Sequence, residues 1–481
     1  MFKSKTQYLL WVFMLVSGLL FFSCQKEESF NSDPNLKLSF SNDSVLFDTV
    51  FTTLGSTTKY LMVYNTSNKP ISISNVRLQQ GAASQYRINV DGQADVSVND
   101  VEIAANDSLF VFIKVRIDPL NFNSPLVVTD SLLFETNGNK QSVSLVAWGQ
   151  DAHYIVGQKV SPNLPAYKIV AGENQHITWA NDKPYVIFGY AVVDSTGSLA
   201  IDAGVRLHFH KGGGLWVYKG GSLKVNGTLA EPVTFQGDRL ESDFEDIAGQ
   251  WDRIWLNEGS IDNEINYAII KNAFVGIQAE TLESSMGNKL ILKNTIIRNV
   301  SGYGILSRFY KIEASNCEIS NCGGDALYIS TGGNYDFRHC TFGNYWMNSV
   351  RQTPSLLISN YYLDPYTQNL YLGSLSKAYF GNCIIYGNLQ EEILTDMDPG
   401  TDSVYTFDHC LMRTTRNFAT AIDCYKNQDP QFVDPSIYDF RLKDTSPAIG
   451  KGDPAIATFV PTDYFAEPRL PLPDLGAYQY K

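Results

Sequence analysis

Short apolar runs separated by polar turns form the main pattern of the chain between residues 37 and 152. Such runs include Lys59–Asn65, Ser108–Val115 and Ser142–Ala147, and turn-forming residues such as Asn137-Gly138-Asn139 lie between them. About seven runs of this kind fit in the stretch, and their length and their boundaries at Asn, Gly and Pro are typical of strands. The pattern therefore predicts an immunoglobulin-like β-sandwich over residues 37–152.

A repeat with a period of 22 to 24 residues dominates the chain from residue 153 to 450. Gly197–Gly204 recurs 24 residues later as Gly221–Gly227, and copies of a second motif end at Asn299, Asn321 and Asn344. Repeats of this size mark solenoids, in which each repeat forms one coil and pairs with the next. We therefore predict an all-β chain in which a sandwich precedes a parallel solenoid.

The cysteines follow the same repeat. Four of them come directly after an Asn or His and begin a predicted strand, namely Cys317, Cys340, Cys383 and Cys410. Buried Cys behaves as a small apolar side chain, so we expect the four to stack inside the solenoid. A disulfide or metal site is the alternative, although parallel side chains suit a disulfide poorly. Five neighbouring residues are predicted to form an internal polar ladder that binds turn backbones, namely Asn294, Asn316, Asn382, His339 and His409.

The N-terminus has the features of an export signal. Lys3 and Lys5 precede the apolar run Tyr8–Phe22, which is too short for a membrane-spanning helix and is followed by Ser23-Cys24. Residues 20–24 resemble a lipobox, which implies a signal peptide over residues 1–23, a lipid on Cys24 and a tether over residues 24–36. An ordinary signal peptide followed by a chance Cys is the alternative. Residues 25–28 resemble the surface-export signal of Bacteroidetes-type lipoproteins and imply the cell surface of an outer membrane. A solvated tether is the alternative interpretation of these four residues.

Three further resemblances concern the folded part of the chain. Asn65, Pro70-Ile71 and Trp148-Gly149 resemble the ASPM–SPD-2–Hydin family of immunoglobulin-like domains, which act as spacers or binding modules. The coil period and the Asn-x-x-Ile-x-Asn motif resemble the pectate-lyase-like family, which implies a right-handed parallel β-helix over residues 153–450. Motifs between Asp429 and Tyr478 resemble the choice-of-anchor Q ending of bacterial surface proteins. We expect residues 451–481 to cap the last coil.

Charge and composition narrow the choice of partner. The formal net charge is −13 and the mature chain contains no basic run, which argues against a nucleic-acid partner. A polyanionic glycan would also be repelled unless cations intervened. Calcium would be the natural cation, but no motif indicates it, and we expect no cofactor.

The sequence contains only weak candidates for catalysis. Because parallel β-helices include polysaccharide lyases and hydrolases, acids at one position of successive coils would indicate an active site. Aligned coils bring Asp325 level with two glycines, and Glu280 level with Arg308. Asp325 and Glu280 are therefore the weak catalytic candidates, with a turn residue and an exposed ion pair as the alternative. His208 and His210 share a strand face, but no third metal ligand can be identified, so we predict no metal site.

Aromatic residues suggest a binding site instead. Six of them crowd a stretch that departs from the plain repeat, namely Tyr345, Trp346, Tyr361, Tyr362, Tyr366 and Tyr371. Exposed aromatic rings can stack on the apolar faces of sugars, so the first five of these residues are the predicted ligand-binding set, with core packing as the alternative.

The sequence thus predicts a lipid-anchored outer-membrane protein, exposed at the surface, with a non-catalytic β-helix that binds glycan or another surface component. A polysaccharide lyase or glycoside hydrolase is the first alternative. A purely structural surface scaffold is the second.

Overall fold

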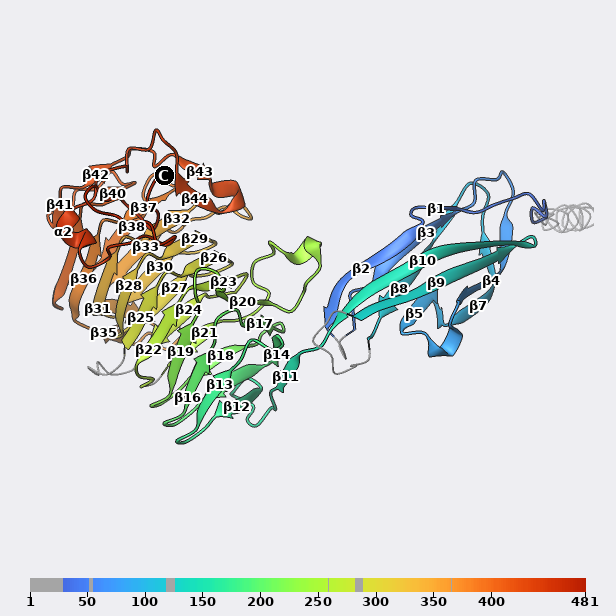
Figure 1. The fold of residues 1–481 in the computed structure, drawn as a ribbon, viewed down its shortest axis with the longest axis horizontal. Helices are drawn as coiled ribbons and strands as arrows, with labels where there is room; N and C mark the ends of the chain where they lie inside the picture. Colours follow the sequence, from blue (N-terminus) through green and yellow to red (C-terminus); the bar gives the residue numbers. More distant parts are fainter. Residues whose placement is uncertain (1–28, 52–54, 118–125, 258, 282–288, 365) are drawn as a thin grey trace, which may run out of the picture. The chain divides into compact units, whose positions relative to one another are not determined.

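The computed structural model describes residues 29–51, 55–117, 126–257, 259–281, 289–364 and 366–481. The predicted signal peptide and Cys24 lie outside these residues. The chain divides into two compact units, one ending at Gln150 and the other running from Asp151 to Lys481. Each unit is described by itself (Figure 1).

The first unit is an immunoglobulin-like β-sandwich of two five-stranded sheets. One sheet contains β1 (Ser39–Phe40), β3 (Lys59–Tyr64), β8 (Ser108–Val115), β5 (Tyr86–Val90) and β6 (Gln93–Asp95), in that order. The other contains β2 (Ser44–Phe51), β10 (Asn139–Gln150), β9 (Leu126–Thr136), β4 (Ile71–Leu78) and β7 (Ser97–Ile103). Strand pairs are antiparallel except for β2 and β10, which run parallel. Inward residues such as Val111, Ile113 and Val143 form its core.

The second unit is a right-handed parallel β-helix in which successive coils contribute strands to three long sheets. The eleven-stranded sheet consists of β11 (His153–Val156), β14 (Tyr185–Phe188), β17 (Arg206–Phe209), β20 (Val233–Gly237), β23 (Ala268–Lys271), β26 (Ile296–Val300), β29 (Glu318–Cys322), β32 (Thr341–Asn344), β37 (Ile384–Gly387), β40 (Leu411–Met412) and β42 (Tyr425–Lys426). The nine-stranded sheet consists of β12 (Tyr167–Ala171), β15 (Tyr190–Val193), β18 (Gly214–Val217), β21 (Ile254–Leu256), β24 (Ile277–Glu280), β27 (Ile305–Arg308), β30 (Leu327–Ser330), β33 (Leu356–Ser359) and β38 (Ile393–Asp396). The ten-stranded sheet consists of β13 (His176–Trp179), β16 (Ser198–Ile201), β19 (Ser222–Asn226), β22 (Asn263–Asn266), β25 (Lys289–Lys293), β28 (Lys311–Ser315), β31 (Gly333–Arg338), β36 (Leu375–Gly381), β39 (Ser403–Asp408) and β41 (Ala421–Ile422). The predicted fold class is confirmed.

A few short elements lie outside these sheets. Two hairpins pair β34 (Tyr361–Leu363) with β35 (Leu370–Leu372) and β43 (Phe432–Asp434) with β44 (Asp439–Leu442). Among the described residues, the helical elements are α2 (Pro454–Ala457) and the 3-10 turns η1 (Gly81–Ala83), η2 (Ser242–Phe244) and η3 (Pro435–Ile437). None of the helices among the described residues is long and apolar enough to cross a membrane.

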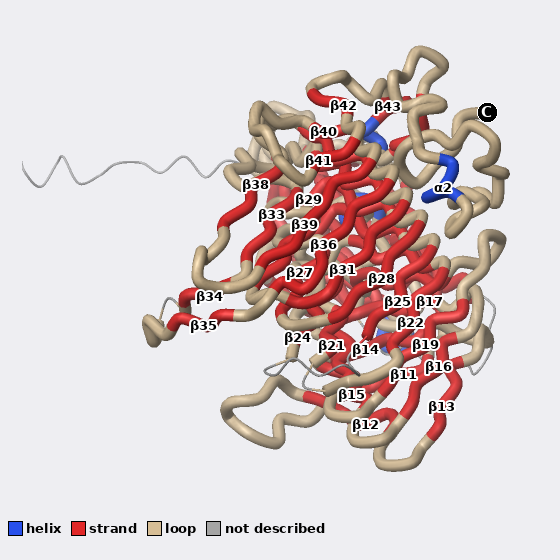
Figure 2. Tube along the Cα trace, turned by 90° about the vertical axis from the view of Figure 1, so that its left-hand side faces the viewer, coloured by secondary structure: helices blue, strands red, loops and turns tan. Residues whose placement is uncertain are grey.

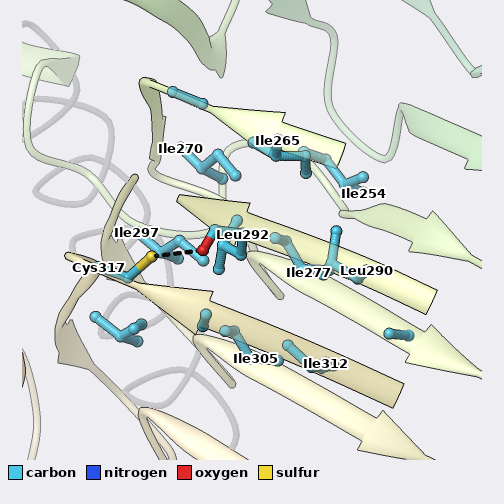
Figure 3. Packing of buried hydrophobic residues seen from close by; sticks show 14 of the residues in the cluster. Ile254, Ile265, Ile270, Ile277, Leu290, Leu292, Ile297, Ile305, Ile312 and Cys317 are labelled. Atoms are coloured by element: carbon cyan, nitrogen blue, oxygen red, sulfur yellow. Dashed lines mark hydrogen bonds between the residues drawn. The ribbon is translucent and has the colours of Figure 1, made fainter. Parts of the chain in front are cut away.

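The interior of the β-helix consists of columns of equivalent side chains. In the nine-stranded sheet the register aligns Ile254, Ile277, Ile305 and Leu327 on successive coils. All four are fully buried, and Figure 3 shows Ile254, Ile277 and Ile305 beside residues of the other two sheets, such as Ile265 and Ile270. Because each coil places the same kind of residue at the same position, the columns pack into one continuous core.

The repeated Asn or His before each Cys has a backbone cause. Asn316, His339, Asn382 and His409 all adopt positive φ angles, between 50° and 54°. Asn and His tolerate this left-handed conformation better than most residues, and here it turns the chain from the ten-stranded sheet into the eleven-stranded sheet. The cysteines that follow, Cys317, Cys340, Cys383 and Cys410, are buried, free and stacked, with each thiol donating to the carbonyl two residues earlier.

The C-terminal segment requires a correction to the predicted position of the cap. Residues 429–481 lie along the outer face of the eleven-stranded sheet, beside the coils rather than across their end. Arg469 is buried there and donates to Asn316 Oδ1 at 2.9 Å, and Tyr478 donates to the buried Glu318. Asn316 and Asn382 also donate to carbonyls of this segment. Asn316 and Asn382 therefore lie at the outer turn and fasten the C-terminal segment instead of lining the interior.

Truncating one member of the interior column tests this packing. We expect Ile305→Ala to lower the free energy of unfolding by about 2–5 kcal/mol, because Ile305 is fully buried and the coils cannot collapse around the cavity. Ile169→Ala, at a strand residue that is 47% exposed, is the matched control and should cost well under half as much. Urea unfolding followed by tryptophan fluorescence measures both, and equal losses would contradict the assigned register.

Candidate functional site

The outer face of the nine-stranded sheet carries a pair of indole rings. Trp216 lies between the buried Leu215 and Val217, and Trp255 lies between the buried Ile254 and Leu256. Since successive side chains of a strand point to opposite faces, both indoles point outward. The register pairs them directly, and their rings stack 4.9 Å apart at 18°. The two coils thus present a half-buried aromatic platform.

A polar group lies next to this platform on the following coils. Glu280 ends β24, and its Oε1 accepts hydrogen bonds from Trp255 Nε1 at 2.7 Å and from Asn257 Nδ2 at 3.2 Å. The register places Arg308 opposite Glu280 on β27, with Nη1 3.5 Å from Glu280 Oε2. Three donors from three strands or turns therefore hold the Glu280 carboxylate in a fixed position.

The β34–β35 hairpin adds further aromatic residues. It departs from the coils after β33 and projects from them, as Figure 2 shows. Tyr362 and Tyr371 face each other across the hairpin with ring centroids 6.3 Å apart, and the Arg308 guanidinium lies 4.4 Å from the Tyr362 ring. Cation–π contact of this kind links the hairpin to the sheet.

The sheet, the turns that follow its strands and the hairpin enclose a pocket of about 540 Å³. Among the described residues, its lining combines two carboxylates, one guanidinium, hydroxyl and amide groups, and three aromatic rings. The lining residues are Asn257, Glu280, Thr281, Arg308, Phe309, Thr331, Tyr362, Asp364 and Tyr371. Volumes of roughly 300–1,000 Å³ and mixed apolar and polar linings are usual for small-molecule sites.

The structure separates the five aromatic residues of the predicted ligand-binding set. Only Tyr362 lines the pocket. Tyr361 lies on the same strand but donates to Asp396 Oδ2 at 2.6 Å, and Tyr366 lies at the hairpin tip and is 95% exposed. Tyr345 packs against Phe432 and Phe440 of the C-terminal segment, and Trp346 is buried with its Nε1 bonded to Ser349 Oγ.

The two candidate carboxyl groups lie at opposite margins of the sheet. Glu280 lies at the end of its strand, whereas Asp325 precedes the start of β30. Strand β30 has four residues, which span roughly 13 Å. The acid pairs of glycoside hydrolases are roughly 5–9.5 Å apart, so Glu280 and Asp325 do not form such a pair.

Asp325 has an unusual environment of its own. Burial raises the pKa of its carboxyl to about 7, against the opposing effects of the Thr353 hydroxyl and the Arg351 guanidinium. Its Oδ1 has no hydrogen-bond partner among the described residues. Next to it, Arg351 and Glu392 form a fully buried ion pair that holds the segment leading into β33.

The two strand histidines have separate partners. Burial lowers the pKa of His208 to about 4, and its Nδ1 lies 3.2 Å from the Gly237 carbonyl oxygen. His210 is exposed, with Nδ1 2.7 Å from Asp238 Oδ2. Within the described ranges, no group of three or more His, Cys, Asp or Glu side chains could hold a metal ion.

Sequence reasoning did not identify most of this pocket. It missed the platform residues Trp216 and Trp255 as outward rings, and it missed Asp364 as a lining residue. It placed Tyr371 in the aromatic stretch but did not include it in the ligand-binding set. A signal for the two indoles exists, since Leu215-Trp216-Val217 and Ile254-Trp255-Leu256 both place Trp between aliphatic residues. Strand alternation turns that pattern into two outward rings on one sheet once the coils are aligned.

Comparisons with known proteins agree with the β-helix. A family model described as a right-handed β-helix region matches residues 282–439. No curated protein matches the chain.

Solved structures that resemble parts of the chain belong to diverse proteins. A family 123 glycoside hydrolase from Clostridium perfringens, studied for glycolipid glycan hydrolysis, shares 8% identity over 24% of this chain and 30% of its own, with a TM-score of 0.17. A Porphyromonas gingivalis W83 protein of unknown function shares 16% identity over 28% of this chain and 58% of its own, with a TM-score of 0.18. The VesB protease of Vibrio cholerae shares 12% identity over 24% and 31%, with a TM-score of 0.16. The chain thus covers less than two thirds of each structure, and at these TM-scores none of them indicates its function.

Proposed function

We propose that this chain is an exported, lipid-anchored surface protein whose β-helix binds a glycan without cutting it. The observation that carries the proposal is the pocket at Glu280, Arg308 and Tyr362, which adjoins the Trp216–Trp255 platform. Glycans combine apolar ring faces with rings of hydroxyl groups, and this site offers both aromatic surfaces and fixed polar groups.

The platform and the pocket follow one another along the coils, and this arrangement suits a chain-like ligand. Trp216, Trp255, Glu280 and Arg308 come from successive coils, which lie about 4.8 Å apart. A glycan that crossed these coils would meet the indole pair first and the pocket next. We infer that the glycan lies across the strands, along the axis of the β-helix.

Two features favour binding over cleavage. A general acid or base must be free to exchange a proton with the substrate, but three donors already bind the Glu280 carboxylate. Asp325 has a pKa suited to proton transfer but is buried at the opposite margin of the sheet. A lyase or hydrolase is therefore the second candidate, favoured only by the pKa of Asp325.

The lipid anchor is part of the same proposal and rests on the Ser23-Cys24 motif. We expect Cys24→Ser to release the protein from the membrane fraction and to abolish labelling with a fatty-acid analogue, because the thiol of Cys24 carries the lipid. Cys424→Ser is the control and should remain in the membrane fraction. Equal fractionation of wild type and Cys24→Ser would contradict the anchor.

Substitutions in the site test the binding proposal. We expect Trp255→Ala and Tyr362→Ala each to weaken glycan binding about tenfold or more, since each removes an aromatic surface and a partner of Glu280 or Arg308. Tyr366→Ala, on the same hairpin but outside the lining, is the matched control. Affinity electrophoresis against a polysaccharide panel measures binding, and chromatography of the same polysaccharides detects cleavage. Unchanged binding by both variants would overturn the site, and shortened chains would establish the enzyme alternative.

A pH profile tests the structural role of Asp325. Because its folded-state pKa of about 7 lies above the ordinary value of 3.8, its protonated form stabilises the fold below about pH 4, and this contribution is lost as the pH rises through 7. Asp325→Asn should remove that loss and be more stable than wild type at pH 8, by roughly 2–4 kcal/mol. Urea unfolding from pH 4 to 8 measures the free energy of unfolding of wild type and variant. Asp364→Asn is the control, because backbone N–H groups lower the pKa of Asp364 instead of raising it. This variant should keep the loss of stability above pH 4. A variant profile parallel to wild type would show that burial of Asp325 is not the cause.

A further inference from the structure

The charges that line the pocket restrict the kind of sugar it accepts. Glu280 and Asp364 contribute two carboxylates and Arg308 one guanidinium. Hydrogen bonds from the backbone N–H groups of Thr367 and Tyr366 hold the pKa of Asp364 below its ordinary value, so this group is ionised at neutral pH. The lining that the described residues form is therefore net negative, in a chain whose formal net charge is −13.

The arginines of this face are already engaged. Arg308 lies 3.5 Å from Glu280 Oε2 and covers the Tyr362 ring. Two coils earlier, Arg253 contacts Asp252 Oδ1 at 2.8 Å and donates to Gln278 Oε1. A uronate or sulfate group of a ligand would have to displace Glu280 from Arg308 and would then lie between two carboxylates. The negative charge of the ligand would then be repelled by the carboxylates of Glu280 and Asp364.

Neutral hydroxyl groups fit the same lining without that repulsion. Sugar hydroxyls can donate to the carboxylates of Glu280 and Asp364, which accept strong charge-assisted hydrogen bonds. They can accept from the hydroxyls of Thr281 and Thr331, which also line the pocket. The Phe309 and Tyr371 rings supply apolar surface for the C–H face of a sugar ring.

We propose that the pocket between Glu280, Arg308 and the β34–β35 hairpin selects a neutral sugar residue and excludes uronic-acid and sulfated residues. The proposal rests on the glycan-binding function proposed above and names the class of glycan. The two carboxylates act as hydroxyl acceptors, and Arg308 positions Glu280 and Tyr362 instead of pairing with an acidic ligand.

Matched oligosaccharides test the selectivity. The mature protein in its Cys24→Ser form is titrated calorimetrically with neutral hexose or pentose oligomers and with uronic-acid oligomers of the same length. We expect at least about tenfold tighter binding of one or more neutral oligomers, with little change on adding NaCl, because no ion pair with the ligand forms. Preferential binding of the uronic-acid series, weakened by salt, would overturn the selectivity and leave the glycan-binding function standing. Failure of both series to bind would overturn the function as well.

A charge-removing variant separates selectivity from general loss of the site. Asp364→Asn should weaken binding of the neutral oligomer severalfold and increase binding of the uronic-acid oligomer, because it removes an acceptor and a repelling charge together. Asp396→Asn is the control, since Asp396 accepts from Tyr361 outside the pocket lining and should change neither affinity. A decrease for both oligomers with Asp364→Asn would contradict the assigned role of that carboxylate.

Discussion

The backbone pairing between coils is the interaction on which the rest of the β-helix depends. A single coil contains three short strands whose N–H and C=O groups point along the helix axis and cannot bond within the coil. They are satisfied only by the coil before and the coil after, so each coil requires its neighbours. Parallel pairing through nine to eleven strands is the result, with register shifts at only a few positions, such as Gly333 and Leu375.

This register decides what each side chain can do. Inward positions repeat as columns such as Ile254, Ile277 and Ile305, and their uniform character keeps the core continuous. Outward positions carry no such constraint, and there Trp255, Glu280 and Arg308 come together from successive coils. The hairpin after β33 is tolerated for the same reason, because β33 still pairs with β38 once the chain returns. The pocket thus uses positions that the pairing leaves free.

The sequence predicted those features that repeat from coil to coil. The Asn or His before each Cys occupies a left-handed turn position, and the Cys that follows is buried, so a short local pattern was sufficient to place both. The Glu280–Arg308 ion pair was also predictable, because aligned coils put the two residues level.

Features that depend on long-range packing could not be predicted in this way. Arg469 bonds to Asn316, and Tyr478 to Glu318, across more than 150 positions of the chain, with no repeat that could indicate the pairing. The C-terminal segment was therefore expected at the end of the coils and lies along their side. Tyr345 and Tyr362 looked equivalent in the sequence, but the first is covered by that segment and the second lies on a projecting hairpin.

Hydrogen–deuterium exchange with and without a bound neutral oligosaccharide tests most directly whether the outer face of the nine-stranded sheet is the binding surface. We predict slower exchange in residues 254–281, 303–309 and 361–372, with the β-sandwich and residues 429–481 unchanged. Protection confined to the sandwich or to the C-terminal segment would contradict the account, because the glycan would then bind elsewhere.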